Sequence, residues 1–173
     1  MKRPSRPPGP PPLVLELRLA GVDQVVTLTF DAESEPVICR RIGELADAGA
    51  YDGAALRSKA WWLQLELPAD ATRALGRTAV EPRRIRHSKF DAGSIGWSWE
   101  KVPSDGRGEF FITRTRQDAL DSAYQQIGAV VGGLGALLAL PIIPAAQLRG
   151  RARIEPAVVE TIRPVRLDVA QAG

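Results

Sequence analysis

Leucines alternate with polar residues near the beginning of the chain. Residues 13–19, LVLELRL, carry a leucine at nearly every second position, and Glu16 and Arg18 fall between leucines. Residues 25–30, VVTLTF, alternate again after a short polar turn. Because successive side chains of a strand point to opposite faces, this alternation is typical of a strand with one buried face. The two segments therefore predict a β-hairpin.

Apolar residues recur at a longer spacing after residue 36. Ile38, Ile42 and Leu45 lie three and four positions apart, which places them on one face of an α-helix. Pro36 suits the first turn of such a helix, where its missing N–H has no partner to lose. Gly49 is placed to end the helix, because glycine adopts the left-handed conformation readily. We therefore expect one amphipathic helix after the hairpin.

Several further apolar runs predict short strands. Residues 61–67, WWLQLEL, alternate so that Trp61 shares a face with three leucines. Residues 94–99 and 109–113 are shorter strand candidates, and residues 152–170 predict one or two closing strands. Many short strands with few helices favour a β-barrel or a β-sandwich.

The first twelve residues, MKRPSRPPGPPP, differ in composition from the rest. They are basic and proline-rich, without the apolar core of a signal peptide. We expect residues 1–12 to form a disordered polyproline tail and residues 13–173 to form one domain. A proline-binding partner for the tail is the alternative. With no targeting signal we expect a cytoplasmic protein, or a periplasmic one if the true N-terminus is missing.

The low content of histidine and cysteine limits the kinds of metal site and disulfide that the chain can form. The chain has one cysteine, Cys39, and one histidine, His87. An internal disulfide and a metal site built from these two residue types are therefore excluded, and we expect neither a metal nor a cofactor. Cys39 lies beside the apolar stripe of the predicted helix, and we interpret it as a small buried side chain rather than a reactive thiol.

A basic run raises the question of nucleic acid. Residues 81–89, EPRRIRHSK, concentrate positive charge in a chain of net charge +3 and pI near 9.4. Such a run could contact phosphates, but it has no interleaved aromatic residues. We interpret it as a solvated loop and expect no nucleic-acid partner.

The uncharged stretch from Ser122 to Leu148 raises the question of a membrane. A transmembrane helix needs about 20 consecutive apolar residues. The segment Ile127–Leu140 is shorter, contains four glycines, and is followed by Pro141. A buried part of a soluble fold is our interpretation, with a membrane anchor as the alternative.

Two blocks of the chain resemble the cyclophilins. In residues 36–56 a proline and a helix precede the turn Tyr51-Asp52-Gly53, as they do in that family. In residues 108–134 the sequences Phe-Phe-Ile, Leu-Asp and Gly-Ala-Val follow in the family's order. Residues 86–99, between the blocks, resemble the family's histidine-to-alanine segment. The order of five weak motifs carries this resemblance.

The resemblance implies a mainly β protein, a closed antiparallel eight-stranded barrel capped by two helices. It also implies peptidyl-prolyl cis-trans isomerase activity on X-Pro bonds of polypeptides. We expect a monomer. Rotation about a peptide bond is opposed by a barrier of about 18–20 kcal/mol. Lowering this barrier requires an apolar surface for the proline and a hydrogen-bond donor for its nitrogen, but no cofactor. The uncharged stretch then becomes a strand, a turn and an unusually apolar second helix, which is a candidate contact surface.

The resemblance also implies which residues form the site. The catalytic residues would be Arg57 and Gln64. The substrate-binding residues would be Trp61, Trp97, Phe111, Leu120 and Tyr124.

The position of Arg57 does not match the spacing of the catalytic arginine in the family. In the family the catalytic arginine lies at a set spacing from the turn tyrosine and from the glutamine. Applied forward from Tyr51 this spacing gives Ser58, and applied back from Gln64 it gives Leu56. A slip of one residue sends a side chain to the other face of a strand. Two alternatives remain open, an arginine in the site and an ordinary surface arginine. They correspond to an isomerase of reduced activity and to a catalytically weak binding module for proline-containing segments.

Overall fold

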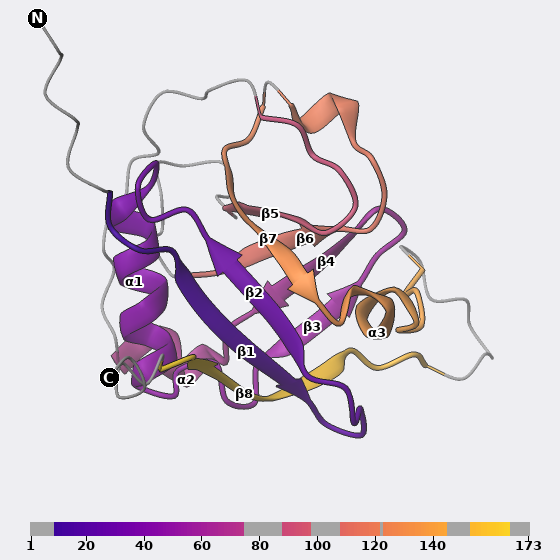
Figure 1. Ribbon diagram of the computed structural model, residues 1–173. Coiled ribbons are helices and arrows are strands. Elements are labelled where there is room, and N and C mark those ends of the chain that lie inside the picture. The colour runs from indigo at the N-terminus through magenta and orange to yellow at the C-terminus, as the bar shows by residue number, and fades with distance from the viewer. Residues whose placement is uncertain (1–8, 75–87, 98–107, 122, 145–152, 167–173) are drawn as a thin grey trace, which may run out of the picture.

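Eight strands form a closed antiparallel barrel in the computed structural model, which describes residues 9–74, 88–97, 108–121, 123–144 and 153–166 (Figure 1). The strands are β1 (Leu13–Leu19), β2 (Val26–Phe30), β3 (Ala55–Ser58), β4 (Trp62–Glu66), β5 (Ser94–Trp97), β6 (Phe110–Thr113), β7 (Gln126–Gly132) and β8 (Ala157–Pro164). Around the barrel they follow the order β1, β2, β7, β5, β6, β4, β3, β8. The predicted barrel is confirmed.

The alternating segments fold as their patterns predict. β1 pairs with β2 as an antiparallel hairpin, with Leu15 opposite Leu28 and both side chains buried. The same alternation in β4 buries Leu63 and Leu65. It leaves Trp62, Gln64 and Glu66 half-buried on the outer face. Trp61 is an exception, because β4 begins at the next residue and the Trp61 side chain is 60% exposed. The expectation that Trp61 shares the leucine face was wrong.

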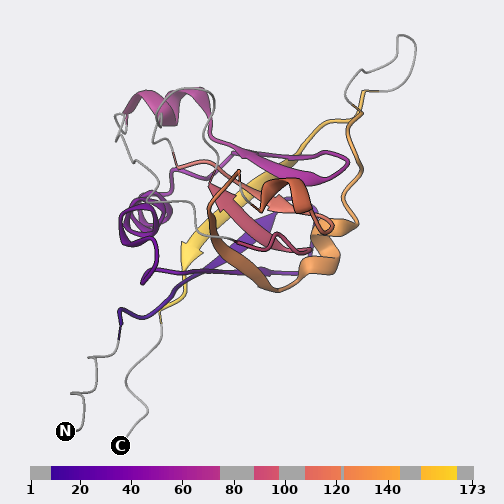
Figure 2. The ribbon, with the colours of Figure 1, turned by 90° about the horizontal axis from the view of Figure 1, so that it is seen from above.

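Two helices cover the barrel on opposite sides, as Figures 1 and 2 show. α1 (Pro36–Asp47) buries Ile38, Ile42 and Leu45 in the core, packing on β1 and β8. It is followed by Gly49, which has a φ of 72° and thus the left-handed conformation expected at a helix end. α3 (Leu134–Leu138) packs on β2. The structure adds the short α2 (Ala69–Ala74) and the 3-10 turn η1 (Asp118–Leu120).

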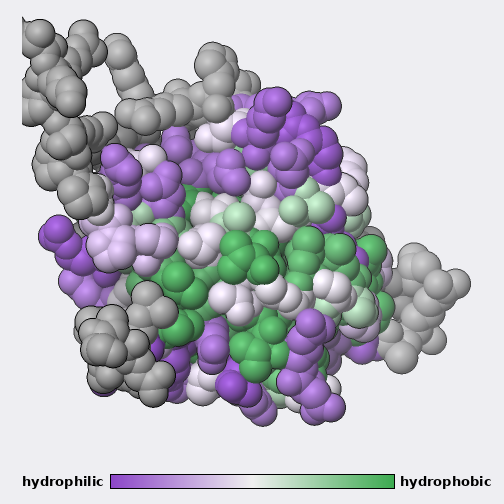
Figure 3. All heavy atoms as spheres, viewed as in Figure 1, coloured by the Kyte–Doolittle hydropathy of each residue, from purple (hydrophilic) through white to green (hydrophobic). Residues whose placement is uncertain are grey.

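The uncharged stretch contributes to the fold as a strand and a helical cap. β7 occupies its first part, and Leu137 of α3 is fully buried in the core. The helix ends at Leu138, three residues before Pro141. Figure 3 shows apolar side chains gathered over the side of the barrel where α3 lies. No helix within the described residues is both long and apolar enough to cross a membrane.

Some expectations lie largely or wholly outside the described residues. These are the polyproline tail, apart from its exposed residues 9–12, and the basic run at 81–87.

Candidate functional site

A row of four residues crosses the outer face of the barrel on neighbouring strands. Arg57 of β3 lies directly opposite Gln64 of β4. Gln64 is in turn opposite Phe111 of β6, and Phe111 is opposite Gly96 of β5. Directly opposed residues in a sheet point to the same face, so these side chains are neighbours. The structure thus brings together three of the residues that the resemblance singled out.

The short β3–β4 hairpin explains the register of Arg57. Its turn is closed by the Lys59 amide, which donates to the Trp62 carbonyl at 2.8 Å. This turn pairs Ser58 with Leu63, both buried, and therefore leaves Arg57 and Gln64 on the outer face. Arg57 is a surface residue and also lies in the candidate site, because the outer face of the barrel is the face that carries Gln64 and Phe111. The two alternatives for Arg57 are therefore compatible.

The guanidinium of Arg57 is held by a carboxylate. Its Nε donates to Oε2 of Glu66 at 2.7 Å, and the two side chains are 40% and 38% exposed. Glu66 lies opposite Ala55 and is therefore the diagonal neighbour of Arg57 across the two strands.

Phe111 forms the centre of an aromatic cluster. Its ring stacks on Phe90 with centroids 5.8 Å apart and meets Tyr124 edge-on at 5.4 Å. A Cβ atom at Gly96 would lie 2.2 Å from a carbon of the Phe111 ring, so only glycine fits beneath it. The Phe111 side chain is 5% exposed, which leaves the half-buried Tyr124 as the larger accessible aromatic surface.

The loop between β6 and β7 holds the cluster in place. Arg116 donates to Asp121 with both terminal nitrogens, and Asp121 Oδ1 accepts from the Phe90 amide at 2.9 Å. The hydrogen bonds from Arg116 and then from the Phe90 amide lower the pKa of Asp121, so the carboxylate stays ionised. The Tyr124 amide donates to the Leu120 carbonyl at 3.0 Å. Leu120 therefore lies in the loop that presents Tyr124.

A hollow of about 630 Å³ adjoins the row at Arg57. It is lined by Arg57, Lys59, Ala60, Trp61, Trp62, Glu66, Ile142, Ile143 and Pro144. The wall at 142–144 is fixed to β3, because the Ile143 amide donates to the Ser58 carbonyl at 2.7 Å. Arg114 reinforces this attachment with two hydrogen bonds of 2.7 Å, to Ser58 Oγ and to the Leu138 carbonyl.

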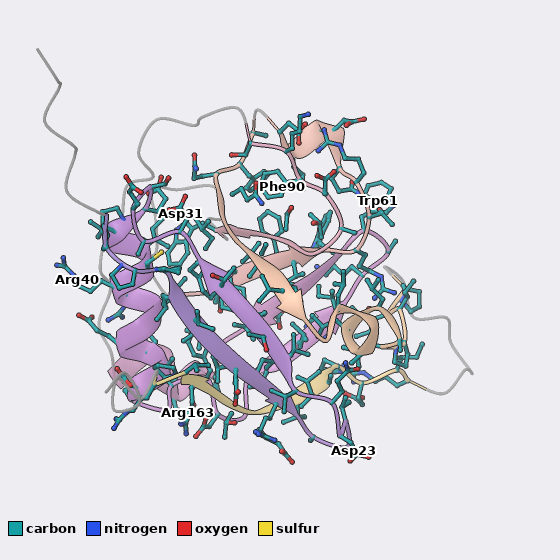
Figure 4. All side chains as sticks on the ribbon, viewed as in Figure 1. Asp23, Asp31, Arg40, Trp61, Phe90 and Arg163 are labelled. Atoms are coloured by element: carbon teal, nitrogen blue, oxygen red, sulfur yellow. The ribbon has the colours of Figure 1, made fainter. Side chains whose placement is uncertain are left out.

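The two tryptophans expected to bind substrate have different places. Trp61 stands at the rim of the hollow, at the tip of the β3–β4 hairpin (Figure 4), with its ring centroid 6.4 Å from that of Trp62. Trp97 is 1% exposed and packs in the hydrophobic core. The expectation that Trp97 lines the substrate groove is therefore corrected. Its position on β5 opposite Phe110, another core residue, turns its ring into the barrel.

Sequence reasoning missed three contributors to this surface. Glu66 and Arg114 are polar residues in ordinary-looking strand and loop segments, and only the fold shows what they contact. Phe90 follows a basic run and carries no periodic signal. The described residues contain no group of three or more metal-binding side chains. What the row offers chemically is a guanidinium donor beside an aromatic surface.

Comparison with known proteins agrees with this architecture. The profile of the cyclophilin type peptidyl-prolyl cis-trans isomerase family matches residues 15–162. A cyclophilin type isomerase from Cryptosporidium parvum superposes with a TM-score of 0.69 at 16% identity, covering 91% of this chain and 99% of that chain. Its structure in the presence of the dipeptide Ala-Pro gives 0.67 at 17% identity, covering 89% and 99%.

A bacterial structure gives a similar result. A cyclophilin from Hirschia baltica superposes with a TM-score of 0.63 at 17% identity, covering 86% of this chain and 72% of that chain. No curated protein matches the chain by sequence. At identities this low, the structural matches show a shared fold alone. The family profile is separate evidence, because it matches most of the chain by sequence.

Proposed function

The chain belongs to the cyclophilin-type peptidyl-prolyl cis-trans isomerase family, and from that membership we propose that it accelerates cis-trans exchange of X-Pro bonds in polypeptides. The observation that carries the proposal is that three members of the row, Arg57, Gln64 and Phe111, lie opposite one another on three adjacent strands. A polypeptide laid across this row would meet a donor and an aromatic surface at once.

Each group in the row has a role in this proposal. The proline ring packs against Tyr124 and the accessible edge of Phe111, with Leu120 at the side of the same loop. Arg57 donates a hydrogen bond to the proline nitrogen as it loses conjugation in the twisted transition state, where a preorganised donor is most effective. Gln64 lies between them, and its amide nitrogen, which donates to the Leu65 carbonyl at 3.2 Å, is the group that would contact the substrate backbone. No bond is made or broken, so the reaction needs neither nucleophile nor metal.

The hollow beside Arg57 suggests which substrates suit the site. It shares Arg57 with the row, and its remaining lining is mainly the apolar side chains of Trp61, Trp62, Ile142 and Ile143. Trp62 is two residues from Gln64 along β4, and residues of a strand rise about 3.3 Å each. A side chain one or two residues from the proline would therefore reach the hollow. We propose that the preferred substrates carry a large apolar residue there.

A second candidate function is supported by the burial of Phe111. At 5% exposure its ring offers little contact area, and a proline held only on Tyr124 could be bound without efficient catalysis. The chain would then be a binding module for proline-containing segments. Binding of an Ala-Pro peptide without faster exchange is the outcome that favours this candidate.

The test measures exchange directly. Two-dimensional NMR exchange on an Ala-Pro-containing peptide reports both isomers, with and without catalytic amounts of protein. We expect wild type to accelerate exchange and Arg57→Ala to reduce the acceleration by at least tenfold. Arg18→Ala removes an exposed arginine from the outer face of β1 and should leave the rate unchanged. If wild type gives no acceleration, or if Arg57→Ala matches it, the isomerase proposal is lost.

A further inference from the structure

The Arg57–Glu66 contact determines where the guanidinium of Arg57 lies. Arg57 starts on β3, and its partner carboxylate is on β4. The contact therefore draws the guanidinium across the hairpin and over β4, the strand that separates β3 from Phe111 on β6. Without a partner on β4, a long arginine side chain could also extend along β3 or toward solvent, because it has several rotatable bonds.

The atoms used in this contact leave the rest of the guanidinium available. Glu66 accepts from Nε at 2.7 Å. Within the part of the chain that the structure describes, the hydrogen bonds of Arg57 include none from its two terminal nitrogens. A guanidinium has five N–H groups in a fixed plane, so fixing Nε also fixes the direction of the others. They remain free to donate to a bound chain.

The contact contributes little to folding. Ion pairs between half-exposed side chains add little to stability, because water solvates and screens both charges. Both side chains line the hollow, and neither belongs to the hydrophobic core. Its main consequence is thus the reduced freedom of the Arg57 side chain at the candidate site.

We infer that Glu66 is a positioning residue, which holds Arg57 by its Nε so that its terminal N–H groups face a proline bound at Phe111 and Tyr124. This inference rests on the proposed isomerase function. Glu66 does not itself touch the substrate nitrogen. It acts through Arg57, and its effect is therefore expected on the rate of exchange in the complex more than on substrate binding.

Two substitutions separate positioning from charge. Glu66→Ala removes the acceptor and should lower kcat roughly threefold to tenfold with little change in KM, because the donor is then placed correctly only part of the time. Glu66→Gln keeps an oxygen that can accept from Nε, and it should retain most of the wild-type kcat. This rescue by the conservative variant is not expected from a carboxylate that matters only for net charge.

A second ion pair of the barrel provides the matched control. Arg163 of β8 binds Asp52 through two hydrogen bonds of 2.8 and 2.7 Å, and these side chains are 42% and 43% exposed. Figure 4 shows Arg163 on the side of the molecule away from Trp61. Asp52→Ala removes an ion pair of similar exposure and should leave kcat and KM unchanged. Thermal unfolding of all variants confirms that they are folded.

The outcomes differ for the two proposals. If Glu66→Ala is as fast as wild type or faster while Arg57→Ala is slow, Glu66 does not position Arg57 and the inference is wrong. The same holds if Asp52→Ala lowers kcat as much as Glu66→Ala does. If wild type itself gives no acceleration, the isomerase function fails, and the positioning role is lost together with it.

Discussion

The ring of Phe111 lies directly over the backbone of Gly96, on the neighbouring strand. A Cβ atom at position 96 would be 2.2 Å from one ring carbon and 2.6 Å from another. Such distances are far below van der Waals contact, so the ring and a larger residue cannot both keep their places. The position of the central aromatic residue of the candidate site therefore depends on a glycine.

Gly96→Ala should disturb both stability and activity. Phe90 and Tyr124 pack against the Phe111 ring, so the ring cannot move away from an added methyl group. We therefore expect the free energy of unfolding to fall by about 1–3 kcal/mol, as in other overpacked sites. Exchange of an Ala-Pro peptide should slow at the same time. Urea unfolding and NMR exchange measure the two effects.

Gly135→Ala is the matched glycine substitution. Gly135 lies in α3, and a Cβ atom there would meet nothing within 4 Å. Alanine is favoured over glycine in a helix by about 0.5–1 kcal/mol, so this variant should be as stable as wild type or more so. A Gly96→Ala protein with wild-type stability would contradict the close packing of Phe111 on β5.

The two tryptophans at positions 61 and 97 should respond in opposite ways. Trp97→Ala removes a large core side chain and should lower the free energy of unfolding by about 3–5 kcal/mol. Trp61→Ala removes a side chain that is 60% exposed and should change stability by no more than about 0.5 kcal/mol. Urea unfolding followed by circular dichroism measures both.

Peptide binding completes this comparison. Trp61 borders the hollow, so Trp61→Ala should weaken the affinity for a peptide with an apolar residue beside its proline. Trp97→Phe keeps an aromatic ring in the core and should leave that affinity unchanged. A loss of affinity in Trp97→Phe, with none in Trp61→Ala, would show that Trp97 rather than Trp61 belongs to the binding surface.

Strand patterns predicted the fold better than they predicted the site. The alternation around Leu15 and Leu63 reflects burial of one face, and burial is what closes the barrel. The place of Trp97 in the groove followed from the resemblance and not from the strand pattern. In β5 the small residues Ser94 and Gly96 alternate with Ile95 and Trp97, and this alternation puts Trp97 on the core face with Ile95. The Arg57–Glu66 contact depends on the β3–β4 register, which a turn of a few residues sets.

Burial of Cys39 should make stability depend on alkaline pH. Burial, with smaller contributions from Asp31 and Glu35, raises the pKa of this thiol from the ordinary 9.0 to about 12. Below pH 9 the thiol is protonated in both the folded and the unfolded chain, and its full contribution to stability is present. Between pH 9 and about 12 only the unfolded chain releases the proton, so the free energy of unfolding should fall.

The contribution of Cys39 is isolated by difference. Cys39→Ala lacks the thiol, whereas the buried phenol of Tyr51, whose pKa is also raised, titrates in both proteins. Urea unfolding at pH 8, 9.5 and 10.5 should therefore show the stability advantage of wild type over Cys39→Ala shrinking as pH rises. A difference that is constant over this range would mean that the thiol ionises equally well in the folded protein.

Ile142 should determine how the site treats residues beside the proline. Its exposed side chain lines the hollow next to Arg57, with Trp61 and Trp62. Ile142→Ser should weaken binding of an Ala-Pro peptide flanked by phenylalanine but not of one flanked by glycine, because only the larger side chain fills the hollow. Val131→Ser is the control, because it also replaces an exposed apolar side chain with serine, on β7, and it should alter neither affinity. Fluorescence titration of wild type and both variants with each peptide measures the dissociation constants. Equal losses for both peptides would show that Ile142 supports the site as a whole, and the preference for a large apolar neighbour would then be wrong.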